Sequence, residues 1–164
     1  MTRPALNAVL GVVVLVLLVC IGVELAKGPP ASAQGSRLSG DYAAVTDAAR
    51  KETLAFLSVD YRRLDPPVAT VLRGATGTFK RQYANAQGNL KATARRERSV
   101  SRGVVRQVGI AKINGSAATV LVAADSSVHN RSTKGRSVTR YYRIQLTMQK
   151  VGNQWLLSDL QFVG

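Results

Sequence analysis

The first hydrophobic segment is a long apolar run near the start of the chain. It extends from Ala5 to Ala26, includes an unbroken series of valines and leucines over residues 12–19, and carries one formal charge, Glu24, close to its end. About 20 apolar residues cross the hydrocarbon core of a bilayer as a helix. The pattern therefore predicts a transmembrane helix over residues 5–26, preceded by a short cytoplasmic segment of residues 1–4.

The flanks of this run predict its orientation. Arg3 precedes it, and cytoplasmic flanks favour positive charge, so the chain from residue 27 onward should lie outside the cytoplasm. A cleaved signal peptide is the alternative, with the small residues 31–33 as its cleavage site. Because cleaved signals have an apolar core of only about 7–15 residues, a retained single-pass anchor in the cell membrane is favoured. Cleavage after Ala33 stays an open alternative.

The next segment is a linker followed by a helix. Residues 27–37 are rich in Pro, Gly and Ser, which is typical of a linker, so the exported domain should comprise residues 38–164. Ser39 or Asp41 can cap the helix, which should end near Tyr61. Its apolar positions recur at helical spacing between polar residues; they are Val45, Ala48, Ala49, Phe56 and Val59, interleaved with Arg50, Lys51 and Glu52.

Two further helices should follow the break at residues 65–67, where two prolines stop the first helix. Pro67 opens a short helix from Val68 to Arg73, and Gly74 and Gly77 separate it from a third helix over residues 78–94. One face of that third helix is apolar and consists of Phe79, Tyr83, Ala86 and Leu90.

From Val100 onward the pattern is that of β-strands. Residues 100–113 are rich in β-branched side chains, with Gly103 and Gly109 as candidate bulges, and Asn114-Gly115 is a hairpin signal. After a second strand and a basic loop over residues 126–136, apolar and polar residues alternate, as a half-buried strand requires. The predicted later strands are residues 117–124, 141–149 with Tyr142, Ile144, Leu146 and Met148 inward, and 155–163 after a turn at Gly152-Asn153.

This order of elements predicts the fold class. Helices come first and an antiparallel meander follows, which is typical of an α+β domain. We therefore expect three helices packed on one face of a curved antiparallel sheet of about four strands.

Charge and cysteine content narrow the function classes. The net charge is +14, and Arg3 and Glu24 cancel, so the exported domain carries nearly all of it. Such a surface favours anionic partners, and outside the membrane these are lipid headgroups or acidic macromolecules rather than nucleic acid. A solvated basic face without a ligand is the alternative. The candidate anion contacts are Lys91, Arg95, Arg96, Arg98, Arg102, Arg131, Lys134 and Arg136.

The residue types that carry metal or catalytic chemistry are sparse in the exported domain. The one cysteine, Cys20, lies in the membrane segment, so the domain has neither a disulfide framework nor a cysteine zinc site. His129 is the one histidine. Asp60 beside Tyr61 would be a candidate base in an apolar cavity, but pairing with the adjacent arginines is the better interpretation. We predict a non-enzymatic protein without a cofactor.

Three ordered motifs of this domain resemble a known family. They are the Asp-Tyr-Arg segment at residues 60–62, the Leu-x-x-x-Thr-Gly-x-Phe element at residues 72–79, and the Gly-x-x-Trp-Leu-Leu-Ser strand at residues 152–158. Together with the short N-terminus and single span, they resemble the actinobacterial Mce-associated membrane proteins. The motif residues expected to have structural roles are Asp60, Tyr61, Arg62, Gly77, Phe79 and Trp155.

The resemblance implies a fold and a function. The implied fold is a cystatin-like cone similar to nuclear transport factor two and to type IV secretion scaffold proteins. The implied function is an accessory subunit that assembles or stabilises an Mce-type lipid-import complex, with transporter subunits as partners. The alternative is a lipid-binding or carrier module, whose cone holds an apolar ligand beside Trp155 and Phe162.

Overall fold

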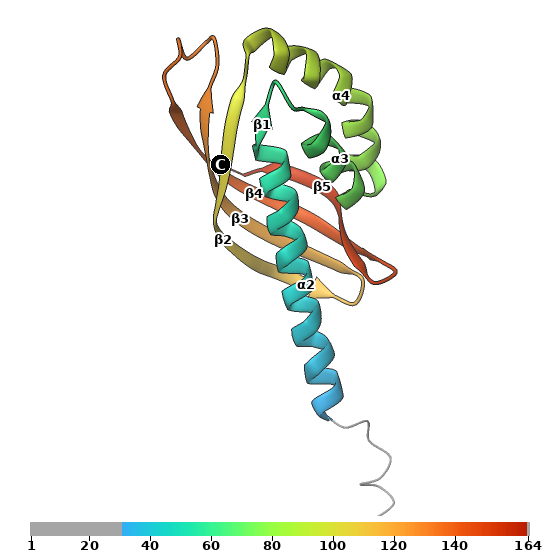
Figure 1. Cartoon of the computed structure of the whole chain (residues 1–164). Helices are drawn as coiled ribbons and strands as arrows, with labels where there is room; N and C mark the ends of the chain where they lie inside the picture. Colours follow the sequence, from blue (N-terminus) through green and yellow to red (C-terminus); the bar gives the residue numbers. More distant parts are fainter. Residues whose placement is uncertain (1–30, 164) are drawn as a thin grey trace, which may run out of the picture. The chain divides into compact units, whose positions relative to one another are not determined.

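The computed structural model describes residues 31–163, and residues from Asp41 onward form one compact unit (Figure 1). The predicted span over residues 5–26 and the segment 1–4 lie outside the described residues. Among the residues that are described, no helix combines the length and apolar character that a membrane crossing needs. The elements are α2 (Ala31–Leu57), β1 (Val59–Asp60), α3 (Asp65–Gly74), α4 (Gly77–Glu97), β2 (Val100–Asn114), β3 (Ala117–His129), β4 (Val138–Val151) and β5 (Gln154–Phe162).

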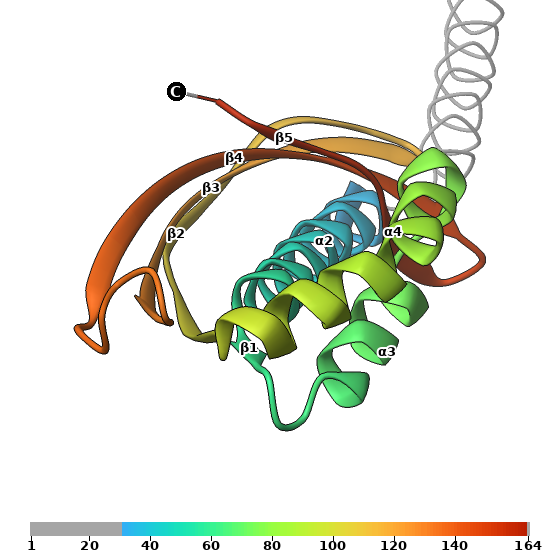
Figure 2. The same cartoon turned by 90° about the horizontal axis from the view of Figure 1, so that it is seen from above.

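The predicted α+β architecture is confirmed. The strands form one antiparallel sheet in the order β1-β2-β3-β4-β5, so each strand pairs with its neighbour in sequence. Figure 2 shows that the sheet is curved and that α2, α3 and α4 all lie on its concave side. The sheet has five strands rather than about four, because residues 59–60 form a short strand against Val100 and Ser101.

The boundaries of the helices differ from the predicted ones. α2 begins at Ala31, so residues 31–37 of the predicted linker are helical and Ser39 and Asp41 lie inside the helix. It ends at Leu57 rather than Tyr61, where the Leu57 carbonyl accepts a hydrogen bond from Ser101 Oγ at 2.8 Å. A side-chain donor from β2 thus satisfies a carbonyl that the end of the helix leaves free.

The two later helices are longer than predicted. α3 already begins at Asp65, and its prolines occupy the first turn, where a missing N–H costs nothing. α4 continues to Glu97 and ends because Arg98 adopts the left-handed conformation at φ 50°. The Arg98 N–H then contacts the carbonyls of Ala94 and Arg95. Chain reversal after α4 therefore uses a residue other than glycine.

The bulges of β2 are not at its glycines. The register shifts between Val105 and Gln107 and again between Ile110 and Lys112, whereas Gly103 and Gly109 were the predicted positions. Gly103 has a different role, because a Cβ there would lie 2.8 Å from the Leu57 Cβ. The glycine therefore allows β2 to pass close to α2.

The hairpin turns follow the predicted pattern, while the basic loop is shorter than predicted. Gly115 and Gly152 both have positive φ, at 49° and 59°, as these tight turns require. β3 continues to His129, so the loop predicted from Ser126 begins only at Asn130. Ser126 is buried in the strand instead.

The core fills the space between α2 and the concave face of the sheet. The predicted alternation in β4 is confirmed, since Ile144, Leu146 and Met148 are almost completely buried. Phe56 of α2 contacts three other rings, with centroids 6.3–6.4 Å away. The buried apolar cluster consists of Val45, Ala49, Leu57, Ala118, Val120, Val122, Ala124, Ile144, Leu146, Met148, Trp155 and Leu157.

Candidate functional site

The predicted basic residues gather at one end of the domain. The Arg131 N–H donates to the Glu97 carbonyl at 2.9 Å, which joins the loop after β3 to the end of α4. Arg102 lies opposite Ser127 near the start of β2, beside the same loop. We call the following exposed residues the basic end: Arg95, Arg96, Arg98, Arg102, Arg131, Lys134 and Arg136.

The loop over residues 130–137 holds its cations on an ordered backbone. Asn130 Oδ1 accepts from the Thr133 N–H at 2.9 Å, and Thr133 Oγ1 accepts from the Asn130 N–H at 3.0 Å. The turn closes with the Lys134 N–H on the Arg131 carbonyl at 3.0 Å. Because these bonds involve backbone groups, the side chains of Arg131 and Lys134 remain available at the surface.

Two of the predicted anion contacts are already engaged by carboxylates. Lys91 Nζ lies 2.7 Å from Asp65 Oδ1, and this hydrogen bond holds the pKa of Asp65 below its usual value. Arg96 Nε lies 3.3 Å from Glu97 Oε1. Within residues 31–163, the predicted contacts that form no ion pair are Arg95, Arg98, Arg102, Arg131, Lys134 and Arg136.

A local structural reason accounts for part of this charge. Arg95 and Arg96 occupy the last turn of α4, where cations stabilise a helix by interacting with the free carbonyls. The same reason does not apply to Arg131, Lys134 and Arg136, which lie in a loop, or to Arg102, which lies in a strand. The concentration of charge at the basic end therefore exceeds what capping α4 requires.

The Asp-Tyr-Arg motif forms a closed surface turn between β1 and α3. Asp60 Oδ1 accepts from the Arg62 N–H at 3.0 Å and from Arg62 Nε at 2.9 Å, and Asp60 Oδ2 accepts from Nη2 at 2.8 Å. The Arg62 guanidinium also lies 5.7 Å from the centre of the Tyr61 ring. These hydrogen bonds hold the pKa of Asp60 below its usual value. Asp60 is thus a partnered surface carboxylate rather than a base in an apolar cavity.

The other motif residues position α4 and the core. Gly77 begins α4 with φ 55°, a conformation that favours glycine. Phe79 stacks on Tyr83 with ring centroids 5.9 Å apart. Trp155 is 5% exposed and belongs to the buried cluster, which is consistent with the structural role expected for it.

A groove lies beside the basic end, between β1, the start of α3 and the start of β2. Its volume is about 450 Å³. Arg102 belongs both to this groove and to the basic end. We call it the β1 groove, and it is lined by Ser58, Val59, Asp60, Arg63, Pro66, Pro67, Val100, Ser101 and Arg102.

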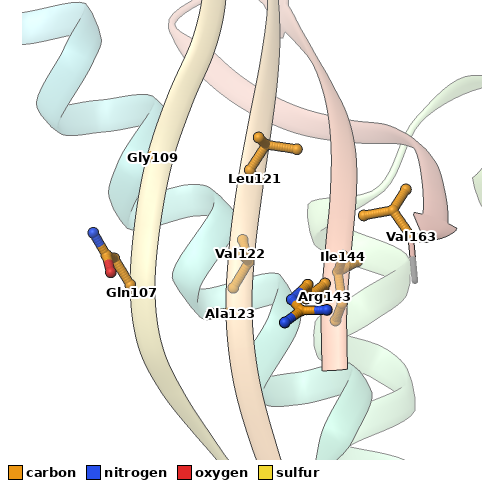
Figure 3. A pocket seen from close by; sticks show the side chains of 8 residues that line it. All are labelled: Gln107, Gly109, Leu121, Val122, Ala123, Arg143, Ile144 and Val163. Atoms are coloured by element: carbon orange, nitrogen blue, oxygen red, sulfur yellow. The ribbon is translucent and has the colours of Figure 1, made fainter. Parts of the chain in front are cut away.

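The outer face of the sheet carries a second hollow. Figure 3 shows it on the side of the strands away from α2, with the side chains of Leu121 and Val163 beside it. Its volume is about 290 Å³, and Gly109 and Ala123 leave its floor low because their side chains are small or absent. Leu121 is 45% exposed there. No helix among residues 41–163 covers this face (Figure 2).

The cavity beside the ring of Phe56 has little room for a ligand. This cavity, between the end of α2, α3 and α4, is lined mainly by apolar groups, including Phe56, Leu64, Val68 and Tyr83, and has a volume of about 160 Å³. Pockets that hold small molecules are usually about 300–1,000 Å³. The Phe162 ring lies 6.3 Å from that of Phe56 and 5.5 Å from that of Tyr142, measured between ring centroids.

Glu52 is a buried carboxylate that the sequence interpretation placed on the polar side of α2. Its side chain is 3% exposed, and Oε2 has no hydrogen-bond partner among the described residues. A Cβ added at Gly74 would overlap the Glu52 carboxyl group, so α3 packs directly on it. Burial raises the pKa of Glu52 to about 7, against the attraction of Lys51 and Arg73.

The position of Glu52 could have been recognised from helical spacing. It lies seven residues after Val45 and three after Ala49, on the face that both of them bury. Its charge concealed this regularity. Thr53, which is also completely buried, satisfies its hydroxyl by donating to the Ala49 carbonyl at 2.8 Å.

The described residues hold no group of three or more His, Cys, Asp or Glu side chains that could bind a metal ion. His129 is exposed at the end of β3.

Solved structures share the fold at low sequence identity. An IcmL-like type IV secretion system protein from Legionella pneumophila superposes with a TM-score of 0.58 and 12% identity, covering 83% of this chain and 94% of that one. The periplasmic domain of DotI gives 0.59 and 14%, over 74% and 94%. CagV, a VirB8 homologue from Helicobacter pylori, gives 0.59 and 9%, over 74% and 97%.

Sequence comparison gives a relative and a family. "Uncharacterized protein Rv1363c" from Mycobacterium tuberculosis is 27% identical over 121 residues, which are 74% of this chain. The match covers 46% of that protein, so this chain corresponds to about half of its length. The profile of the family described as "Uncharacterized protein Rv1363c/MT1408-like" matches residues 6–164, and the chain therefore belongs to the Rv1363c/MT1408-like family.

Proposed function

We propose that this protein is a non-enzymatic accessory subunit that assembles or stabilises an Mce-type lipid-import complex at the cell envelope. In this proposal, residues 5–26 anchor the chain in the cell membrane and the α+β domain lies outside the cytoplasm. The motif resemblance supports the link to Mce transporters. The fold shared with periplasmic domains of type IV secretion proteins supports an extracytoplasmic domain that takes part in protein assemblies.

The observation that carries the proposal is the contrast between the packed concave side of the sheet and its open outer face. The concave side of the sheet is packed with large side chains, and its largest buried members include Ile144, Leu146 and Met148. The outer face, in contrast, is covered by no helix of the described unit and exposes Leu121 and Val163 around a hollow. A protein that binds partners needs such a surface, whereas an enzyme or carrier needs a cavity.

The lipid-carrier alternative has less support. An acyl chain would need an interior space larger than the cavity of about 160 Å³ beside Phe56 and Tyr83. Trp155 and Phe162 are the residues expected to line a lipid groove. Trp155 instead belongs to the buried core, and the ring of Phe162 contacts those of Phe56 and Tyr142. Mass spectrometry of lipids extracted from the purified chain would revive this alternative if it found a stoichiometric ligand.

Co-purification tests the proposal. The full chain carrying an affinity tag is isolated from membranes in mild detergent, and we expect Mce transporter subunits in the eluate. Leu121→Asp, which places a charge on the outer face of the sheet, should remove them. Leu90→Asp is the matched control, because Leu90 is similarly exposed, at 49%, but lies on α4. An eluate without transporter subunits, or equal loss with both variants, contradicts the proposal.

A further inference from the structure

The basic end lies at a defined place relative to α2. The Leu57 carbonyl, at the end of α2, accepts hydrogen bonds from Ser101 and Ser126, the strand residues next to the basic end. Asp41, where the compact unit begins, lies at the other end of this helix segment. At 1.5 Å per residue the two positions are about 24 Å apart. The basic end therefore lies far from Asp41, the residue at which the compact unit begins.

The β1 groove has a mixed lining that matches a peptide. Val59, Pro66 and Pro67 contribute apolar surface, while Arg63 and Arg102 contribute positive charge. The carboxylate in the lining, Asp60, is occupied by Arg62. An extended peptide can place apolar side chains in such a groove and direct its carboxylates to the arginines at the rim.

The surrounding surface extends the positive charge beyond the groove. Arg102 connects the groove to Arg98 and to the 130–137 loop, and these cations form no ion pair within the described unit. Most of them are arginines, whose planar forks bind carboxylates with two hydrogen bonds. The surface therefore places apolar side chains next to arginines that can each bind a carboxylate through two hydrogen bonds.

We propose that the β1 groove and the basic end together bind an acidic segment of a partner protein that also carries apolar residues. This inference rests on the proposed function in that the partner would be a subunit of the same envelope complex. The apolar lining of the groove beside its arginines favours a protein segment over a layer of lipid headgroups.

The test measures binding of a peptide to the full chain in phosphatidylcholine nanodiscs. The probe is a fluorescent peptide in which Glu alternates with Leu and Val, and its anisotropy reports the dissociation constant. Arg102→Glu and Arg131→Glu should each weaken binding about tenfold, because each converts an attraction into a repulsion. The matched control is Arg81→Glu on the first turns of α4, where Arg81 donates to Thr78 Oγ1 at 3.0 Å. It changes the net charge equally and should weaken binding less than about twofold.

Three results overturn the inference. One is the absence of peptide binding by the unaltered chain at low salt. Another is an equal loss with Arg81→Glu, which would show a response to net charge alone. The third is binding of added phosphatidylglycerol vesicles, but not of the peptide, with the same dependence on Arg102 and Arg131. Fluorescence of Trp155, the one tryptophan of the chain, verifies that each variant is folded.

The outcome is separable from that of the co-purification experiment. If no transporter subunit co-purifies but peptide binding shows the expected pattern at Arg102 and Arg131, the proposed function is wrong and the groove inference stands. If the subunits co-purify and depend on Leu121, while the peptide binds without this pattern, the groove inference is wrong and the proposed function stands.

Discussion

Replacing Glu52 by glutamine should stabilise the domain at neutral and alkaline pH. The carboxyl group is buried against Gly74 of α3, and its Oε2 has no hydrogen-bond partner within residues 31–163. Glutamine keeps the size of the side chain but cannot ionise. The variant therefore removes the cost of a buried charge while preserving the packing of α2 on α3.

The size of the effect follows from the pKa. Burial raises the pKa of Glu52 from 4.5 to about 7, and each pKa unit corresponds to about 1.4 kcal/mol. The folded state binds the Glu52 proton more tightly than the unfolded state does. Protonation of Glu52 therefore stabilises the folded state fully below pH 4.5, and this stabilisation is lost as the pH rises through 7. The ionised carboxylate should then cost the folded state about 3 kcal/mol.

The assay compares urea denaturation at two pH values. Unfolding of the full chain in mild detergent is followed by the fluorescence of Trp155, which is buried in the domain core. The difference in unfolding free energy between Glu52→Gln and the unaltered chain should be about 3 kcal/mol larger at pH 8 than at pH 4.5. Other titrating groups contribute equally to both proteins and cancel.

A neighbouring substitution provides the control. Thr53→Val changes a buried side chain of the same helix without changing a titratable group, so its effect on stability should be the same at both pH values. If the difference for Glu52→Gln is also the same at pH 4.5 and pH 8, Glu52 does not titrate as a buried carboxyl group and the reasoning is refuted.

Other substitutions test the packing, each by urea denaturation at constant m-value. Gly74→Ala places a methyl group into the Glu52 carboxyl and should cost about 1–3 kcal/mol, whereas Gly88→Ala in an open part of α4 should gain about 0.5–1 kcal/mol; a gain from both would contradict the contact. Leu146→Ala should cost about 2–5 kcal/mol, since the side chain is fully buried. Leu121→Ala on the outer face should change stability by about 0.5 kcal/mol or less. Similar losses for Leu146→Ala and Leu121→Ala would contradict the assignment of the core to the concave side of the sheet. Gly115→Ala, at φ 49°, should cost about 1–2 kcal/mol, and an unchanged midpoint would argue against the left-handed turn.

The sheet could be predicted from local signals because its strands follow one another in sequence. Apolar residues every second position identified the inner face of β4, and Asn114-Gly115 identified the β2–β3 hairpin. β1 was not predictable in this way. Phe56 and Val59 fit a continuing helix, but pairing of Val59 with Ser101, 42 residues later, replaces the last turn by a strand.

The candidate site was predictable in composition but not in arrangement. The basic residues are visible in the sequence, yet only the fold brings Arg131 to the end of α4. Lys91 has a carboxylate partner 26 residues away in sequence, which local patterns do not show. The burial of Glu52, in contrast, was visible in a local pattern. Its helical spacing places it in the core, although its charge suggested the surface.

The long strand β2 has one side that no strand of the described residues covers beyond Ser101. Free strand edges are templates for aggregation, and proteins protect them with bulges and charged side chains. The two bulges of β2 fall between Val105 and Gln107 and next to Lys112, so the row of free backbone groups is interrupted twice. Deleting one residue at each of the two bulges would convert this edge into a continuous template for fibre formation.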